Sequence, residues 1–212
     1  MPQAILIDNQ PISATFFGEG KWLTEFVTPD ALEVQALYES LTNGLDELED
    51  RLTACWAWVA NEVKYVKFVK GKLWVNGHTS FQDDLWNTPA ITRRVKVGNC
   101  ANKSFLLCSL LRNQLSADQV QCVLGNLHNG KPGGHVWIQL SLGGQDYIME
   151  STRADVPPFV PVVATERYES IHLFNDKNIY TIPGRTVMTP FTACYSEWLS
   201  DYLDFAYING SK

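Results

Sequence analysis

The spacing of apolar residues predicts two helices in the first third of the chain. Helical spacing relates Leu32, Leu37 and Leu41, and the flanking Asp30 and Gly44 are expected to cap and to stop this helix. A second helix is expected over residues 45–63, because its apolar positions follow the i, i+4, i+7, i+8, i+11 pattern of one helical face. These positions are Leu48, Leu52, Cys55, Trp56 and Val59.

In the rest of the N-terminal half, short apolar stretches alternate with glycine and proline residues that interrupt regular structure. Apolar runs at residues 4–7 and 12–17, followed by glycines, predict short strands and turns. Between residues 64 and 97 the pattern is interrupted at Gly71, Gly77 and Pro89, which predicts a long irregular connection with one short strand. Connections of this length are often functional.

A strongly apolar segment follows Gly98-Asn99-Cys100. Apolar residues cover most of the circumference over residues 101–115, which predicts a buried helix with a cysteine at its first turn. Strands are expected at 119–127, 135–142 and 146–151, separated by the glycine-rich segment 129–134 and by Gly143-Gly144. The tail after Pro157-Pro158 is mixed, with one helix expected near 194–205. The predicted fold class is α+β, with a buried helix packed on an antiparallel sheet.

Composition and charge narrow the class of protein. The 212 residues are 45% apolar, contain no apolar run of membrane-spanning length and begin without a secretory leader, so we expect a single cytoplasmic domain with no membrane partner. A net charge of −6 provides no electrostatic footprint for nucleic acid. The five cysteines include no CxxC pair, which argues against a disulfide framework and a zinc site; no cofactor is indicated. The oligomeric state stays open.

Cys100 is the candidate nucleophile, because backbone N–H groups and the dipole at a helix N-terminus stabilise a thiolate. A small buried core side chain is the alternative interpretation of Cys100. Nucleophilic attack also requires an imidazole that shares the thiol proton, and an acceptor that orients the imidazole. The chain offers His78, His128, His135 and His172. We interpret the remaining cysteines as core thiols: Cys55, Cys108, Cys122 and Cys194.

Hairpin register selects His135 from these candidates. If Gly143-Gly144 form a two-residue turn, Leu142 pairs with Gln145. The same register makes His135 and Glu150 diagonal neighbours, with Cβ atoms about 7 to 8 Å apart and their side chains within hydrogen-bonding reach. One face of the hairpin is then apolar and the other carries the polar pair. The apolar face holds Val136, Ile138, Leu140, Tyr147 and Met149, and the other holds His135, Trp137, Gln139, Ile148 and Glu150.

The sequence around Cys100 resembles the nucleophile region of transglutaminase-like proteins. Residues 84–89 (DLWNTP), 98–104 (GNCANKS) and 106–112 (LLCSLLR) carry this resemblance. The order continues with His135 in the segment HVWI and Glu150 fifteen residues later, where the family has a histidine and an aspartate. The resemblance covers residues 45–152, with an N-terminal segment 1–44 and a C-terminal extension 153–212 outside it.

This resemblance implies a papain-like or transglutaminase-like core in which Cys100, His135 and Glu150 form a catalytic triad. It also implies that the indole N–H of Trp86 helps to hold an oxyanion, with a packed core tryptophan as the alternative. Asn99 replaces the usual acidic residue before the cysteine, and Glu150 replaces the usual aspartate. A glutamate accepts the same imidazole N–H bond with one extra methylene group, so activity is retained as an expectation.

The expected reaction is cysteine-dependent acyl transfer on a protein or peptide substrate, through a thioacyl intermediate. Hydrolysis by a thiol protease is favoured, because the small bacterial-type members that the chain resembles are protease-like. Transglutamination or glutamine deamidation is the enzyme alternative. A catalytically silent binding or scaffold module is the alternative of another class.

Overall fold

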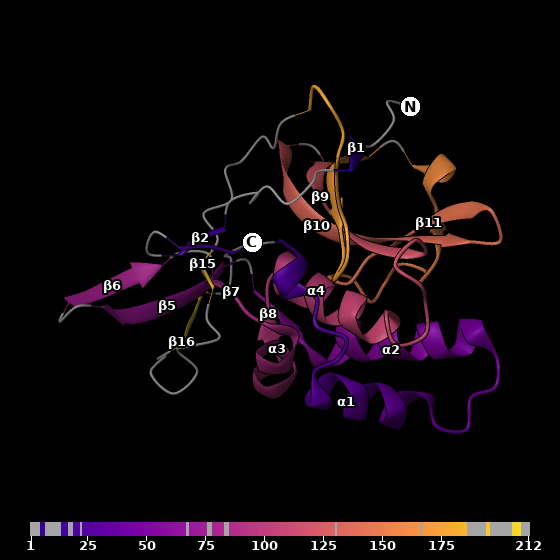
Figure 1. Cartoon of the computed structure of the whole chain (residues 1–212), viewed down its shortest axis with the longest axis horizontal. Helices are drawn as coiled ribbons and strands as arrows, with labels where there is room; N and C mark the ends of the chain where they lie inside the picture. Colours follow the sequence, from indigo (N-terminus) through magenta and orange to yellow (C-terminus); the bar gives the residue numbers. More distant parts are fainter. Residues whose placement is uncertain are drawn as a thin grey trace.

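A group of helices packs against one side of a curved antiparallel sheet in the computed structural model of the chain (Figure 1). The structure describes residues 5–6, 14–16, 19–21, 23–66, 68–75, 78–82, 85–129, 131–165, 167–185, 194–195 and 205–208. Within these ranges the side chains of 23–66, 86–128, 133–165 and 167–185 are described. No helix in this part of the chain combines the length and the apolar character needed to cross a membrane.

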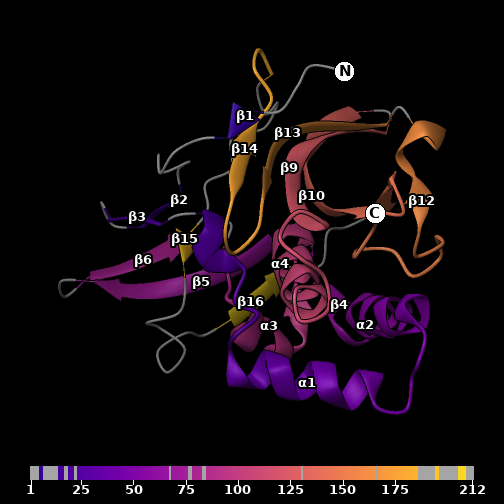
Figure 2. The same cartoon turned by 45° about the vertical axis from the view of Figure 1, so that its right-hand side comes forward.

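The main sheet joins strands from the middle and the C-terminal part of the chain. Its order in the described residues is β1-β14-β13-β9-β10-β11-β12, and neighbouring strands run antiparallel. The strands are β1 (Ile5–Leu6), β9 (Val120–Asn129), β10 (Lys131–Leu142), β11 (Gln145–Met149), β12 (Val160–Pro161), β13 (Tyr168–Phe174) and β14 (Ile179–Thr181). Figure 2 shows how this sheet curves around the helix α4 (Cys100–Leu111).

Helix α4 lies at the centre of the molecule and packs on β9 and β10. The helices α1 (Leu32–Thr42), α2 (Leu48–Glu62) and α3 (Pro89–Val95) contact it from the side away from the sheet (Figure 1). Each residue of α4 after Cys100 is buried, as expected from apolar positions around the whole circumference. The predicted α+β class, with the cysteine-bearing helix buried on an antiparallel sheet, is confirmed.

Helices α1 and α2 confirm the two helices predicted early in the chain, but their first residues, Leu32 and Leu48, are exposed, and the N-cap of α1 differs from the prediction. The apolar stripe of α2 is buried at Leu52, Cys55, Trp56 and Val59, whereas Leu48 at its first turn is exposed. Gly44, which follows α1, has a φ of 79°, the left-handed conformation that ends a helix most readily at glycine. The prediction that Asp30 caps α1 is wrong: the N-cap is Ala31, which makes no side-chain capping bond.

The connection between α2 and α4 is more regular than predicted. It contains β4 (Lys64–Tyr65), β5 (Phe68–Val75), β6 (His78–Gln82), β7 (Leu85–Trp86), α3 and β8 (Val97–Gly98). Pro89 does not interrupt structure but lies in the first turn of α3, where its missing N–H costs no helical hydrogen bond. Val75 pairs with His78, so the Asn76-Gly77 dipeptide between them was the sequence signal for a hairpin.

The hairpin of β10 and β11 has the predicted register. Leu142 pairs with Gln145 and Ile138 with Met149, and both turn glycines have positive φ, of 59° and 80°. Val136, Ile138, Leu140 and Met149 of one face lie in the main core, while Trp137 and Ile148 of the other face join a second apolar cluster. The glycine-rich segment 129–134 was expected to separate two strands, which is wrong for residues 131–134, because they belong to β10 and pair with β9.

The tail beyond residue 152 extends the main sheet, which no local pattern had indicated. Strand β13 pairs with β9 and so makes β9 an inner strand of the sheet. The helix expected near 194–205 is wrong at both of its ends, where β15 (Cys194–Tyr195) and β16 (Phe205–Ile208) are strands. Its middle, 196–204, lies outside the described residues. Further short strands are β2 (Ala14–Phe16) and β3 (Glu19–Lys21), and the short 3-10 helices are Leu23–Phe26 and Val162–Ala164.

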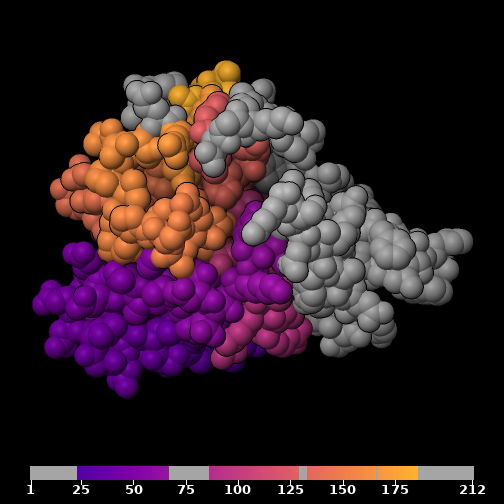
Figure 3. Space-filling model, turned by 180° about the vertical axis from the view of Figure 1, so that it is seen from behind, coloured from indigo at the N-terminus to yellow at the C-terminus, as the bar shows by residue number. Residues whose placement is uncertain are grey.

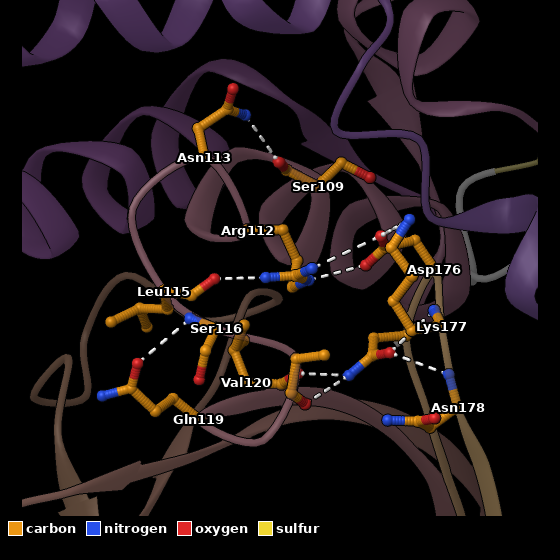
Figure 4. Close-up of polar contacts among 12 residues, drawn as sticks. Ser109, Arg112, Asn113, Leu115, Ser116, Gln119, Val120, Asp176, Lys177 and Asn178 are labelled. Carbon is orange, nitrogen blue, oxygen red and sulfur yellow. Dashed lines mark hydrogen bonds and ion pairs between the residues drawn. The ribbon is translucent and has the colours of Figure 1, made fainter.

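An ion pair joins the end of α4 to the turn between β13 and β14 (Figure 4). Arg112 donates from Nε to Asp176 Oδ1 at 2.6 Å and from Nη1 to the carbonyl of Leu115. The two side chains of the ion pair are only 11% and 9% exposed. Arg112, the last residue of the segment 106–112, therefore ties the C-terminal end of the central helix to the C-terminal tail.

Candidate active site

Cys100 is the first residue of α4, as the sequence predicted. Asn99 is the N-cap, and its Oδ1 accepts a hydrogen bond from the backbone N–H of Asn102 at 3.1 Å. An asparagine is among the favoured N-caps, so the departure from the acidic family residue preserves the start of the helix. A Cβ at Gly98 would lie 2.8 Å from the Cβ of Asn102, which explains why this position holds glycine.

His135 and Glu150 meet in the folded chain. The Nε2 atom of His135 lies 2.8 Å from Oε2 of Glu150, and the residues are 8% and 2% exposed. The regular β10–β11 pairing ends at Ile138 and Met149, so the glutamate lies just beyond its strand and reaches the histidine with its side chain. The sequence-based prediction of this pair from hairpin register is thus matched by its observed contact.

The imidazole of His135 interacts with Cys100 as well as with Glu150. Burial disfavours the imidazolium, but hydrogen bonds and charges from Cys100 and Glu150 outweigh burial and raise the pKa of His135 to about 10. Since Nε2 is occupied by the carboxylate, Nδ1 is the ring nitrogen left for the sulfur. The folded chain therefore brings the three predicted residues together in the order thiol, imidazole, carboxylate.

Glu150 is held by residues that the sequence reasoning did not identify. Its Oε1 accepts from the backbone N–H and the hydroxyl of Thr152, at 2.9 and 2.7 Å, and Tyr168 donates to Oε2 at 3.2 Å. Burial favours the neutral acid, yet the hydrogen bonds and charge of His135 and the bonds from Thr152 hold the pKa of Glu150 below its usual value. The carboxylate is therefore fixed in position and ionised at neutral pH.

The helical layer also contacts Glu150. Trp56 of α2 donates from its indole N–H to the backbone carbonyl of Glu150 at 2.7 Å. In Figure 3 the orange part of the chain, which includes the residues after 150, lies directly against the indigo N-terminal helices. Glu150 is thus held by contacts from the helices as well as from the sheet and its connections.

Comparison with known proteins yields structural likenesses only. No family model matches the chain. A search of curated proteins finds no match either.

Among solved structures, the chain is similar to a Cytophaga hutchinsonii protein proposed to be a cysteine protease, with 19% identity and a TM-score of 0.45. That likeness covers 86% of this chain and 60% of the other, so the chain spans less than two thirds of that structure. Legionella pneumophila LapG is similar at 12% identity and a TM-score of 0.43, over 74% of this chain and 89% of LapG.

A cleft of about 630 Å³ opens beside the histidine and the glutamate. Its polar wall includes Thr152, Tyr168 and the guanidinium-bearing Arg153 and Arg167. Its apolar wall is formed by Leu127, Ile148, Val156, Val160 and Ala164. The cleft has the size and the mixed lining of a site that receives a side chain or a short peptide segment.

Exposure separates Cys100 from the other described cysteines. Cys55, Cys108 and Cys122 are fully buried, as expected for core thiols, while Cys100 is partly exposed. The side chain of Cys194 lies outside the described residues. Burial raises the pKa of Cys55 to about 12 and that of Cys122 well above its usual value. These thiols are consequently poor nucleophiles.

Trp86, His128 and His172 make contacts that are structural rather than catalytic in kind. Trp86 is 1% exposed and packs edge-on against Phe26 and Phe105, with ring centroids 5.3 and 5.1 Å away. This packing suits the core interpretation, and its role at an oxyanion stays a prediction. His128 contacts Glu169, and His172 contacts Thr181. The side chain of His78 lies outside the described residues.

Lys103 is a further buried group close to the site. It is 1% exposed, and its Nζ donates to the carbonyls of Ala60 and Val63 at 3.1 and 2.5 Å, at the end of α2. Burial lowers the pKa of Lys103 to about 8, and the negative charge of Glu150 opposes this decrease. Lys103 is a charged residue in a helix whose other residues are uncharged, and this was the sequence signal for a buried lysine that caps a neighbouring helix.

Proposed function

We propose that this chain is a cysteine-dependent acyl-transfer enzyme that hydrolyses amide or peptide bonds. The observation that carries the proposal is the contact of His135 with both Cys100 and Glu150, because one imidazole placed between a thiol and a buried carboxylate is the arrangement that activates a cysteine. The position of Cys100 at the first residue of a buried helix adds stabilisation of the thiolate.

In the first half of the reaction, the sulfur of Cys100 attacks the carbonyl carbon of the substrate and forms a C–S bond. The negative charge that develops on the carbonyl oxygen is held by the backbone N–H of Cys100, with Trp86 as a second candidate donor. The imidazolium of His135 then transfers its proton to the leaving amine as the C–N bond breaks. A thioacyl enzyme and a free amine result.

In the second half, neutral His135 removes a proton from water while the water oxygen attacks the thioacyl carbon. The C–S bond breaks, the acid product leaves, and the proton on His135 restores the starting ion pair with the thiolate. Glu150 stabilises the imidazolium throughout and keeps its ring in one orientation. An amine in place of water would give transglutamination.

The cleft beside His135 is the proposed location of the part of a protein or peptide substrate that flanks the scissile bond, because its lining includes His135 and Glu150 but not Cys100. It is bordered by the buried polar atoms of the site and by apolar side chains suited to a substrate side chain. Hydrolysis is favoured over amine transfer by the sequence resemblance to small protease-like members of the transglutaminase-like family.

The experiment that tests this proposal is a paired assay on the purified chain. A peptide library would be analysed by mass spectrometry for cleavage, and the same peptides would be incubated with a labelled amine to detect incorporation. We expect cleavage that depends on Cys100 and is absent from Cys100→Ala, with Cys122→Ala as the matched control for loss of a thiol. Amine incorporation without cleavage would favour transglutamination. If neither product forms and Cys100 does not react with amide-mimic probes, the catalytically silent scaffold would be favoured.

A further inference from the structure

Ser104 lies one helical turn after Cys100 and therefore on the same side of α4. Its side chain is fully buried. The Oγ atom of Ser104 lies 3.0 Å from the backbone carbonyl of Val136, which follows His135, and 3.0 Å from Oγ of Ser151, which follows Glu150. One hydroxyl thus contacts the immediate neighbours of both proposed partners of the cysteine.

The direction of these two hydrogen bonds follows from proton counting. A carbonyl oxygen accepts and cannot donate, so the single hydroxyl proton of Ser104 is committed to Val136. Ser151 must then donate its own proton to Ser104. The result is a directed chain, Ser151 to Ser104 to Val136, that crosses from the residue after the acid, through the helix of the nucleophile, to the strand of the histidine. Such chains strengthen cooperatively in a dry interior.

We propose that Ser104 is a positioning residue that holds Cys100, His135 and Glu150 in one arrangement. The expected effect of Ser104 on the reaction rate rests on the proposed function. The positioning of the three groups by Ser104 is inferred from its hydrogen bonds alone. The three groups come from three separate parts of the chain, and within the described residues Ser104 of α4 bonds to the chain beside both of the others. Loss of the Ser104 hydroxyl would free the helix to shift relative to the strands.

Ser109 provides a matched control on the same helix. It is equally buried, and its hydroxyl donates to the carbonyl of Phe105 at 2.8 Å and accepts from the backbone N–H of Thr28 at 2.9 Å. Replacing Ser109 with alanine also removes a buried, hydrogen-bonded hydroxyl from α4. Its partners lie away from His135 and Glu150 in the chain, so this variant reports the cost of a lost buried hydroxyl alone.

The test compares Ser104→Ala, Ser151→Ala and Ser109→Ala in the full chain. For Ser104→Ala we expect kcat to fall on the order of tenfold to a hundredfold with KM unchanged, because misplacement by about 1 Å costs up to that factor. The pKa of His135, followed by NMR titration, should move below the wild-type value because its contacts with Cys100 and Glu150 weaken. Ser151→Ala keeps the bond to Val136 and should show smaller changes in the same direction, whereas Ser109→Ala should change neither quantity.

Equal kcat and equal His135 titration in Ser104→Ala and Ser109→Ala would overturn the proposal. If Ser104→Ala does not fold, Ser151→Ala decides the matter against Ser109→Ala by the same two measurements. An inactive wild-type chain would count against the proposed function, while the titration of His135 would still support or overturn the positioning role.

Discussion

At the scale of single residues, the chemistry of the site depends on the protonation states of Cys100, His135 and Glu150. The Cys100 sulfur, the His135 ring and the Glu150 carboxylate form one hydrogen-bonded series, and the last two are buried. In a buried series the loss of one charge changes the protonation of its neighbours.

Cys100 should be the fastest of the described thiols to react with iodoacetamide. It is partly exposed, and the other described cysteines are fully buried, with burial raising the pKa of Cys55 and Cys122. Alkylation followed by peptide mapping measures the order of labelling. Faster labelling of Cys108 or Cys122 than of Cys100 in the folded protein would show that the nucleophile is misassigned.

Glu150→Gln should move the alkaline limb of the pH profile of kcat/KM to lower pH. The wild-type imidazolium persists until the pH passes the His135 pKa of about 10, and the charge and hydrogen bond of Glu150 contribute to that high value. Without the carboxylate the pKa of His135 falls, so the imidazolium is lost at lower pH, while residual turnover remains. Glu62→Gln is the matched control, because this half-exposed glutamate pairs with Lys96 and does not line the cleft. An alkaline limb that does not move would show that Glu150 is not the partner of His135.

Glu150→Asp should reduce kcat/KM on the order of a hundredfold, as expected for a displacement of about 1 Å. The carboxylate bonds to Thr152 through one oxygen and to His135 through the other, and both contacts depend on the length of the glutamate side chain. A shorter side chain attached at the same backbone position keeps one of these contacts at most. Steady-state kinetics measure the change. Wild-type kcat/KM in both Glu150→Asp and Glu150→Ala would mean that another acceptor orients His135.

At the scale of elements, α4 is the part of the fold that connects nucleophile, sheet and tail. Asn99 caps its first turn, Lys103 joins it to the end of α2, and Arg112 joins its last turn to the β13–β14 connection. The two ends of the helix are thus fixed by different parts of the chain. Function resides at the N-terminal end, so the contacts at the other end are expected to affect stability first.

Arg112→Ala should lower the free energy of unfolding by about 3 kcal/mol, because it leaves the mostly buried Asp176 with the exposed Lys177, whose Nζ lies 3.4 Å from Oδ2, as its remaining ion-pair partner among the described residues. Urea unfolding followed by circular dichroism measures the change. Glu62→Gln is the matched control: its ion pair with Lys96 is about half exposed, and its loss should cost about 0 to 1 kcal/mol. Equal effects of the two substitutions would contradict the structural role of Arg112.

At the scale of the whole molecule, the segment 153–185 belongs to the core of the fold. Phe174 is buried in the main cluster, and Leu173 and Ile182 cover Trp137 and Val123 on the outer face of the sheet. Tyr168 of the same segment donates to the proposed acid. Residues outside the family-like stretch 45–152 therefore also contribute to the apolar core of the fold.

A chain that ends at residue 165 should lose cooperative thermal unfolding. Without β13 and β14, β9 becomes an edge strand and the second apolar cluster loses its cover. Calorimetry on the truncated and full chains measures the difference, and Tyr168→Phe in the full chain controls for loss of that one hydroxyl. A truncated chain with the wild-type unfolding midpoint would disprove this prediction.

The sequence by itself determined the features that depend on local pattern. The period of apolar positions located α1, α2 and α4, and Gly143-Gly144 set a register that placed His135 and Glu150 on one face. These features follow from residues close together in the chain, whose spacing dictates which side chains share a face.

Only the tertiary structure decided which distant segments meet. The pairing of β13 with β9, the contacts of Trp56 and Tyr168 with Glu150, and the bridge through Ser104 join residues that lie far apart in the chain. The spacing of residues along the chain does not reveal such partners. A serine, tyrosine or tryptophan occurs in the same sequence pattern whether or not a distant residue lies close to it in the fold. Those contacts form when the helices pack on the sheet, because polar groups that are buried away from water are then hydrogen-bonded to other groups of the protein.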